Sequence, residues 1–142
     1  MSPDYIMTTN KTKEKLLEEL KKIINTMYGT NPQQSDSRSR MLNQRHFDRV
    51  FQMMEHSKGR IIHRVGDYDR ASLFIPPVSY LTKYIINHVI KNQTISEVET
   101  NDALMQEEVF GPILPILTVE DLDKAIDIIN TGNKVLDFFL KF

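Results

Sequence analysis

Along this chain, segments with helical periodicity alternate with short apolar runs that have the composition of β-strands. Three segments carry apolar side chains every three or four positions and are expected to be helices: residues 11–27, 39–56 and 120–130. Three short runs rich in branched or aromatic residues are expected to be strands: residues 60–65, 72–75 and 113–119. Alternating helices and strands are typical of α/β proteins, and 142 residues suit one domain, so the sequence predicts a single α/β domain.

The ends of these elements are marked by residues with known positional preferences. Gly29 is expected to end the first helix. Pro115 cannot donate to a ladder, so it predicts that its strand lies at a sheet edge or carries a bulge. Residues 80–91 fit a helix or a strand equally well. Polar residues are expected to cap the helices: Asn10 or Thr12 for the first, Ser37 or Ser39 for the second, and Thr118 with Asp121 for the third.

Composition excludes several classes of function. The net charge is −1, which gives no electrostatic footprint for nucleic acid, and no apolar stretch is long enough to form a membrane segment. The chain has no cysteine, which excludes disulfides, cysteine-bound metals and a thiol nucleophile supplied by these residues. Its five glycines form no phosphate-binding loop, and its four histidines lack metal-ligand spacing, so no metal site is expected. The absence of cysteine and of a secretory signal favours a cytoplasmic location.

The segment from Met105 to Ile116 is the sharpest chemical feature of the sequence. It places the carboxylates Glu107 and Glu108 before Phe110, a Gly-Pro turn and an apolar strand. A carboxylate at a strand end can accept hydrogen bonds from the two hydroxyls of a ribose, and an aromatic ring can pack against a nicotinamide. The other interpretation of the same residues is an acidic turn before a buried strand.

The segment EEVFGPILPI resembles the EE-[IV]-FGP motif of the aldehyde dehydrogenase superfamily. Further segments resemble its class 3, fatty-aldehyde branch in the order in which that branch has them. They are PDYI at residues 3–6, NQRHFDRV at 43–50, FIPPV at 74–78 and AIDIIN at 125–130. The resemblance runs over about residues 3–78 and 97–130, and it implies that the α/β chain is a piece of the aldehyde dehydrogenase catalytic domain.

The resemblance also implies a mechanism. In the family a cysteine thiolate attacks the aldehyde, hydride passes to NAD or NADP, and water hydrolyses the thioester to a carboxylic acid. By motif position, Glu108 would bind the nicotinamide-side ribose of the cofactor and Phe110 would line the nicotinamide pocket. We expect Glu108 to be partly accessible and to lack an arginine partner for its carboxylate. The implied partners are an aldehyde substrate and, in the complete family enzyme, a second subunit of a homodimer.

The chain also departs from the family pattern. The resemblance places the nucleophilic cysteine one position before Met1, so no catalytic residue is expected within residues 1–142, and the cofactor-binding domain is expected to be absent. An atypical insert is expected at about 79–96 and a divergent tail at 131–142. We therefore expect a partial catalytic domain that is inactive alone. The alternative is a non-catalytic fragment or interaction module that docks on a full-length subunit.

Overall fold

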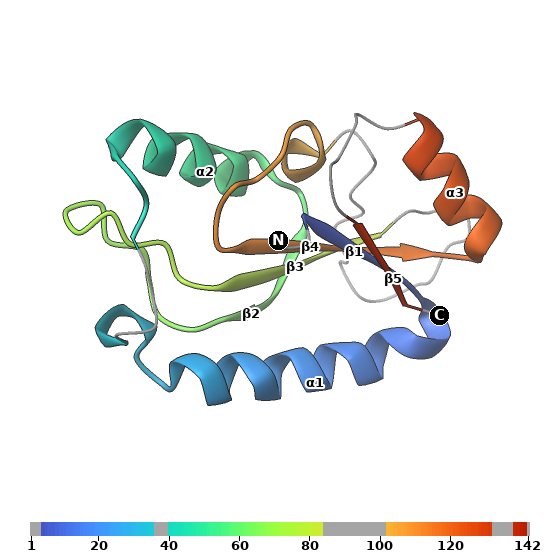
Figure 1. Ribbon diagram of the computed structural model, residues 1–142, viewed down its shortest axis with the longest axis horizontal. Coiled ribbons are helices and arrows are strands. Elements are labelled where there is room, and N and C mark those ends of the chain that lie inside the picture. The colour runs from blue at the N-terminus through green and yellow to red at the C-terminus, as the bar shows by residue number, and fades with distance from the viewer. Residues whose placement is uncertain (1–3, 36–39, 84–101, 132–137, 142) are drawn as a thin grey trace.

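The computed structural model describes residues 4–35, 40–83, 102–131 and 138–141. Within these residues a five-stranded sheet carries helices on both faces (Figure 1). The strand order is β2-β3-β4-β1-β5, with β2 antiparallel to β3 and all other neighbours parallel. The strands are β1 (Tyr5–Thr9), β2 (Arg60–Arg64), β3 (Val78–Lys83), β4 (Ile113–Val119) and β5 (Phe138–Lys141). The predicted α/β fold is confirmed.

Three helices cover the sheet: α1 (Asn10–Tyr28), α2 (Gln44–His56) and α3 (Leu122–Thr131). In Figure 1, α1 runs along one face while α2 and α3 lie on the other. The arrangement follows from the alternation of side chains along β4: Ile116 packs with Leu17 of α1, whereas Leu117 packs with Ala125 of α3. Two short 3₁₀ turns complete the described elements: η1 (Pro32–Gln34) and η2 (Ala103–Met105).

The apolar stripe of α2 packs on the end of the sheet where β4 begins. Phe47 and Val50 are fully buried there, together with Val78 of β3, Ile113 of β4 and Val109 just before β4. All three helical segments expected from periodicity are confirmed. Periodicity located them because helical spacing and the need to bury one face are both local properties of the sequence.

One of the three expected strands is wrong. Residues 60–64 and 113–119 form β2 and β4, but residues 72–75 lie in a turn closed by an isolated bridge between Asp69 and Phe74. The Asp69 carboxylate accepts hydrogen bonds from the Ala71 N–H at 2.9 Å and the Ser72 hydroxyl at 2.7 Å. This side chain satisfies polar groups that a strand would pair with a neighbour, and Leu73 accordingly has a φ of 55°.

The expected N-terminal caps are also corrected. Thr9 precedes α1 in extended conformation, so Asn10 and Thr12 lie inside the helix. Asn43 caps α2 by accepting from the His46 N–H at 3.0 Å, so this helix begins at residue 44 and not near Ser37 or Ser39, both outside the described residues. Asp121 caps α3 by accepting from the Lys124 N–H at 2.9 Å, while Thr118 is buried within β4. Gly29 ends α1 as expected, with a φ of 66°.

Pro115 does not lie on an edge strand, because β4 is the middle strand of the sheet. The ladder between β1 and β4 starts at Ile116, so Pro115 precedes the point where β1 joins β4, and its missing N–H is tolerated there. β1 was not expected from the sequence.

The segments expected as insert and tail contribute strands to the sheet. Residues 79–83 of the expected insert belong to β3, so residues 80–83, which fitted a helix or a strand equally well, form a strand. Residues 84–96 of the expected insert lie outside the described part of the chain. Residues 138–141 of the expected tail form β5 beside β1. Among the described helices, none combines the length and apolar character needed to cross a bilayer.

Candidate functional site

The EEVFGP turn, residues 107–112, connects η2 to the amino end of β4. Two segments distant in the sequence meet it: Asp4, which immediately precedes β1, and Arg49 on α2. Since β1 and β4 are parallel neighbours, their amino ends lie at the same edge of the sheet, and this explains how residue 4 reaches the turn. The site therefore lies at the amino ends of the two central parallel strands.

Arg49 holds the backbone of the turn. Its Nη1 donates to the Glu108 carbonyl at 3.1 Å, and its Nη2 donates to the Val109 carbonyl at 2.6 Å. The same guanidinium lies 3.3 Å from the Glu107 carboxylate and 3.4 Å from the sulfur of Met53. The arginine therefore pairs with the carboxylate of Glu107 and with the main chain. Glu108 itself is partly exposed, as expected.

The main chain at Val109 is held from a second direction by Asp4. The Val109 N–H donates to Oδ1 of Asp4 at 3.0 Å, and the valine side chain is buried in the cluster under α2. Burial raises the pKa of the Asp4 carboxyl, and the charge of Glu108 raises it further, against the lowering effects of the Val109 N–H and of Arg49. The Asp4 carboxyl thus lies within electrostatic reach of both the Glu108 carboxylate and the Arg49 guanidinium.

Phe110 combines an exposed ring with a strained backbone. Its φ is 42°, in the left-handed region that side chains other than glycine rarely adopt, and its residue is 74% exposed. The two residues after Phe110 are held in place by contacts of their own. A Cβ on Gly111 would lie 3.1 Å from Cγ1 of Val50, and the Pro112 carbonyl accepts from the Val78 N–H at 3.0 Å. A large aromatic side chain is therefore presented to solvent by a rigid turn.

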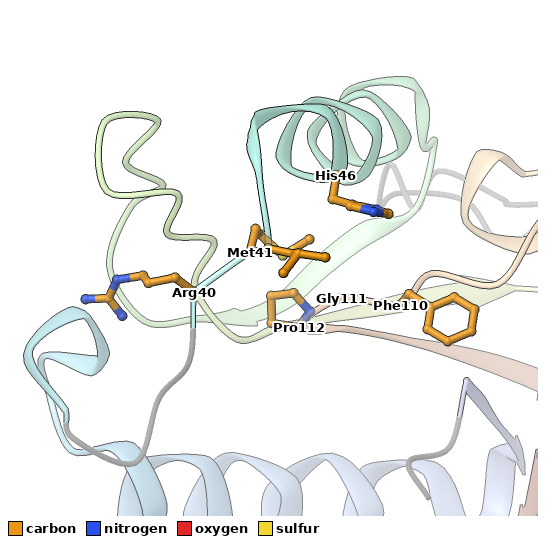
Figure 2. A pocket seen from close by; sticks show the side chains of 7 residues that line it. Arg40, Met41, His46, Phe110, Gly111 and Pro112 are labelled. Atoms are coloured by element: carbon orange, nitrogen blue, oxygen red, sulfur yellow. The ribbon is translucent and has the colours of Figure 1, made fainter.

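Phe110 lines a pocket of about 450 Å³, whose walls come from the segment before α2, from α2 and from the turn. Figure 2 shows Arg40 and Phe110 at opposite ends of the view, with Met41 and Pro112 between them. Glu108 does not belong to the pocket lining, which consists of Arg40, Met41, Leu42, His46, Phe110, Gly111 and Pro112. Phe110 therefore lines this concave surface whereas Glu108 does not, although both were expected to face one, and the ligand roles of the two residues stay predictions.

The arrangement suits recognition of a flat, hydroxyl-bearing ligand. A partly exposed carboxylate can accept hydrogen bonds from vicinal hydroxyls, and an exposed aromatic ring on a well-held main chain offers a face or edge for stacking. Within the described ranges, no group of three histidine or acidic residues is arranged to hold a metal ion.

Asp4 and Arg49 were missed as site residues. Both lie in the segments PDYI and NQRHFDRV that carry the family resemblance, and that membership was the signal that could have found them. Their convergence leaves no local pattern, because the bonds to the turn join residues 59, 60 and 105 positions apart.

Comparison with known proteins gives a consistent result. The model of the aldehyde dehydrogenase family matches residues 1–136. Aldehyde dehydrogenase family 3 member H1 of Arabidopsis thaliana is 34% identical over 142 residues, which are 99% of this chain and 26% of that protein. The dimeric NADP-preferring aldehyde dehydrogenase of Mus musculus is 31% identical over 140 residues, covering 99% of this chain and 27% of that protein.

A solved structure agrees in fold as well as sequence. The substrate-bound state of Staphylococcus aureus AldH superimposes with a TM-score of 0.79 at 33% identity, covering 97% of this chain and 27% of that one. The chain spans about a quarter of the length of the curated relatives that it matches.

Proposed function

The chain belongs to the aldehyde dehydrogenase family, and from this premise we propose that it forms part of the catalytic domain of an NAD- or NADP-dependent enzyme that oxidises aldehydes to carboxylic acids. The observation that carries the proposal is the EEVFGP turn. It places a partly exposed carboxylate two residues before an exposed aromatic ring, and its backbone is held by Arg49 and Asp4.

The residues of the turn fit the nicotinamide end of such a cofactor. The carboxylate of Glu108 would accept hydrogen bonds from the ribose hydroxyls, and Phe110 would pack against the nicotinamide ring. When bound, the cofactor supplies the acceptor for the hydride of the substrate. The contribution of this chain is to bind and orient: a ring held by a strained, immobilised backbone loses little freedom when a ligand packs against it.

The chemical step needs groups from outside these residues. The 142 residues contain no cysteine, so the thiolate that would attack the aldehyde has to come from another part of the enzyme. We therefore expect no aldehyde-dependent NADH or NADPH formation by the 142-residue chain alone. The finer parts of the proposal are a fatty-aldehyde substrate, a homodimeric enzyme and a cytoplasmic location. The dimeric, NADP-preferring mouse relative supports the second of these and the choice of NADP.

The proposal is tested in a chimera in which this chain replaces the matching quarter of Staphylococcus aureus AldH. Glu108→Gln should slow hydride transfer and weaken cofactor binding, because a neutral amide is a poorer acceptor for the ribose hydroxyls. Stopped-flow formation of NADH or NADPH and a binding titration of each cofactor measure the two effects.

Glu120→Gln is the matched control. It removes an exposed carboxylate just beyond the opposite end of β4, and it should change neither the rate nor the affinity. If Glu108→Gln left cofactor kinetics untouched and instead cost several kcal/mol of stability, the turn would be a structural element and the proposal would be wrong.

A further inference from the structure

The main chain of Val109 is held at both of its peptide groups by residues that have no part in the proposed binding itself. Its N–H donates to Asp4 in front of β1, and its carbonyl accepts from Arg49 on α2. Val109 directly precedes Phe110, so the orientation of its main chain fixes the position of the Phe110 backbone from which the ring extends. An arginine suits this position because its planar guanidinium presents several donors in a fixed fork, here to two successive carbonyls.

The strained conformation of Phe110 requires such support. A non-glycine residue with φ of 42° persists only where the surrounding structure over-determines it. The ring cannot supply that support through its own burial, because the residue is 74% exposed. The backbone contacts of its neighbours supply it instead: Arg49 and Asp4 before it, and the close packing of Gly111 on Val50 after it.

The ion pair with Glu107 does not account for the role of Arg49. The Glu107 side chain is 57% exposed, and exposed ion pairs contribute little because water screens them. The two hydrogen bonds to carbonyl oxygens are the contacts that fix the main chain, and one of them reaches a residue whose side chain is fully buried. We infer that Arg49, assisted by Asp4, is the positioning residue that holds Glu108 and Phe110 in the orientation that cofactor binding needs. This inference rests on the proposed function for what the turn binds.

The first arm of the test uses the 142-residue chain and needs no activity. Amide hydrogen exchange is followed by NMR at residues 109, 110 and 111 in the unsubstituted chain, Arg49→Met and Arg49→Lys. We expect a roughly tenfold loss of protection at these amides in Arg49→Met, with unchanged protection in the core of the sheet. Arg49→Lys should lie between the two, because an ammonium keeps the charge but cannot bond both carbonyls in the fork geometry.

Arg45→Met is the matched control, because Arg45 lies on the same helix with an exposed side chain. It should leave all three amides unchanged. Equal loss of protection in Arg45→Met and Arg49→Met, or no loss in Arg49→Met, would overturn the inference. If Arg49→Met lost amide protection throughout the sheet, the comparison would pass to Arg49→Lys. Normal protection in the sheet with lost protection in the turn of Arg49→Lys would support the inference, whereas lost protection throughout the sheet in both variants would mean that Arg49 stabilises the whole fold and would overturn it.

The second arm measures kinetics in the chimera with Staphylococcus aureus AldH. A positioning role predicts that Arg49→Met lowers kcat about tenfold or more and raises the KM for the cofactor, with partial recovery in Arg49→Lys. A merely structural role would lower the amount of folded enzyme and leave the KM unchanged. If the unsubstituted chimera showed no turnover, the proposed function would be contradicted, while the exchange experiment would still decide whether Arg49 holds the turn.

Discussion

Gly111 is the residue at which the geometry of the turn can be tested most directly by a stability measurement. A Cβ built there would lie 3.1 Å and 3.2 Å from the two γ-carbons of Val50, which is fully buried, so that this side chain would have to shift by a few tenths of an ångström within the core. The backbone of Gly111 is not in the left-handed region, so its cost on substitution is steric rather than conformational. Overpacking of a core by one methyl group costs about 1–3 kcal/mol, and the reduced freedom of the unfolded chain returns about 0.4–1 kcal/mol. Gly111→Ala should therefore lower the free energy of unfolding by roughly 1–2 kcal/mol.

A double-mutant cycle with Val50→Ala isolates the contact. Val50→Ala alone should cost about 2 kcal/mol through lost burial and a residual cavity. In that background the methyl group added at position 111 has room, so the cost of Gly111→Ala should fall to about zero. The coupling free energy between the two positions should be about 1–2 kcal/mol, within the range measured for residues in contact.

Urea unfolding followed by far-ultraviolet circular dichroism measures all four corners of the cycle. Gly66→Ala is the control: its φ of 84° makes alanine unfavourable, but nothing lies within 4 Å of the added Cβ. It should cost about 1–2 kcal/mol in both backgrounds, without coupling to Val50. A Gly111→Ala cost that is the same in the Val50→Ala background as in the unsubstituted chain would refute the close packing of the turn on α2.

Three further predictions concern the turn and the helix that supports it. Phe110→Gly should change the free energy of unfolding by less than about 1 kcal/mol despite the loss of a large ring, because relief of the strained φ offsets the flexibility that glycine adds to the unfolded chain. A loss of several kcal/mol in urea unfolding would show that the ring is part of the core. Asp4→Asn should gain stability relative to the unsubstituted chain as the pH rises from about 3 to about 7, since a carboxyl whose pKa is raised by burial binds its proton more tightly in the folded state and costs stability once it ionises; parallel unfolding curves at each pH measure the difference, and a trend in the opposite direction would mean that the Val109 N–H and Arg49 together outweigh burial. Asn43→Ala should lower stability by about 1 kcal/mol by removing the cap of α2, whereas Asn31→Ala, at a 3₁₀ turn start without a side-chain cap, should be nearly neutral in the same thermal unfolding assay.

The regular elements were predictable where their cause is local. The helices follow from apolar residues at helical spacing, and β4 follows from seven apolar or branched residues after a Gly-Pro turn. The errors at residues 72–75 and at the starts of α2 and α3 share another cause: one polar side chain, such as Asp69 or Asn43, bonded to nearby backbone groups and moved a boundary. Such choices depend on small energy differences among several suitable polar residues.

By itself, the sequence determined the helical faces, the fold class and the turn that carries the carboxylate and the ring. Only the tertiary structure decided that β4 lies in the middle of the sheet and that Asp4 and Arg49 meet at Val109. The physical reason is that periodicity and turn chemistry act between near neighbours, whereas these bonds join residues 60 and 105 positions apart. They require that the parallel strands pair and that α2 packs on their ends, and no local sequence pattern predicts these long-range contacts.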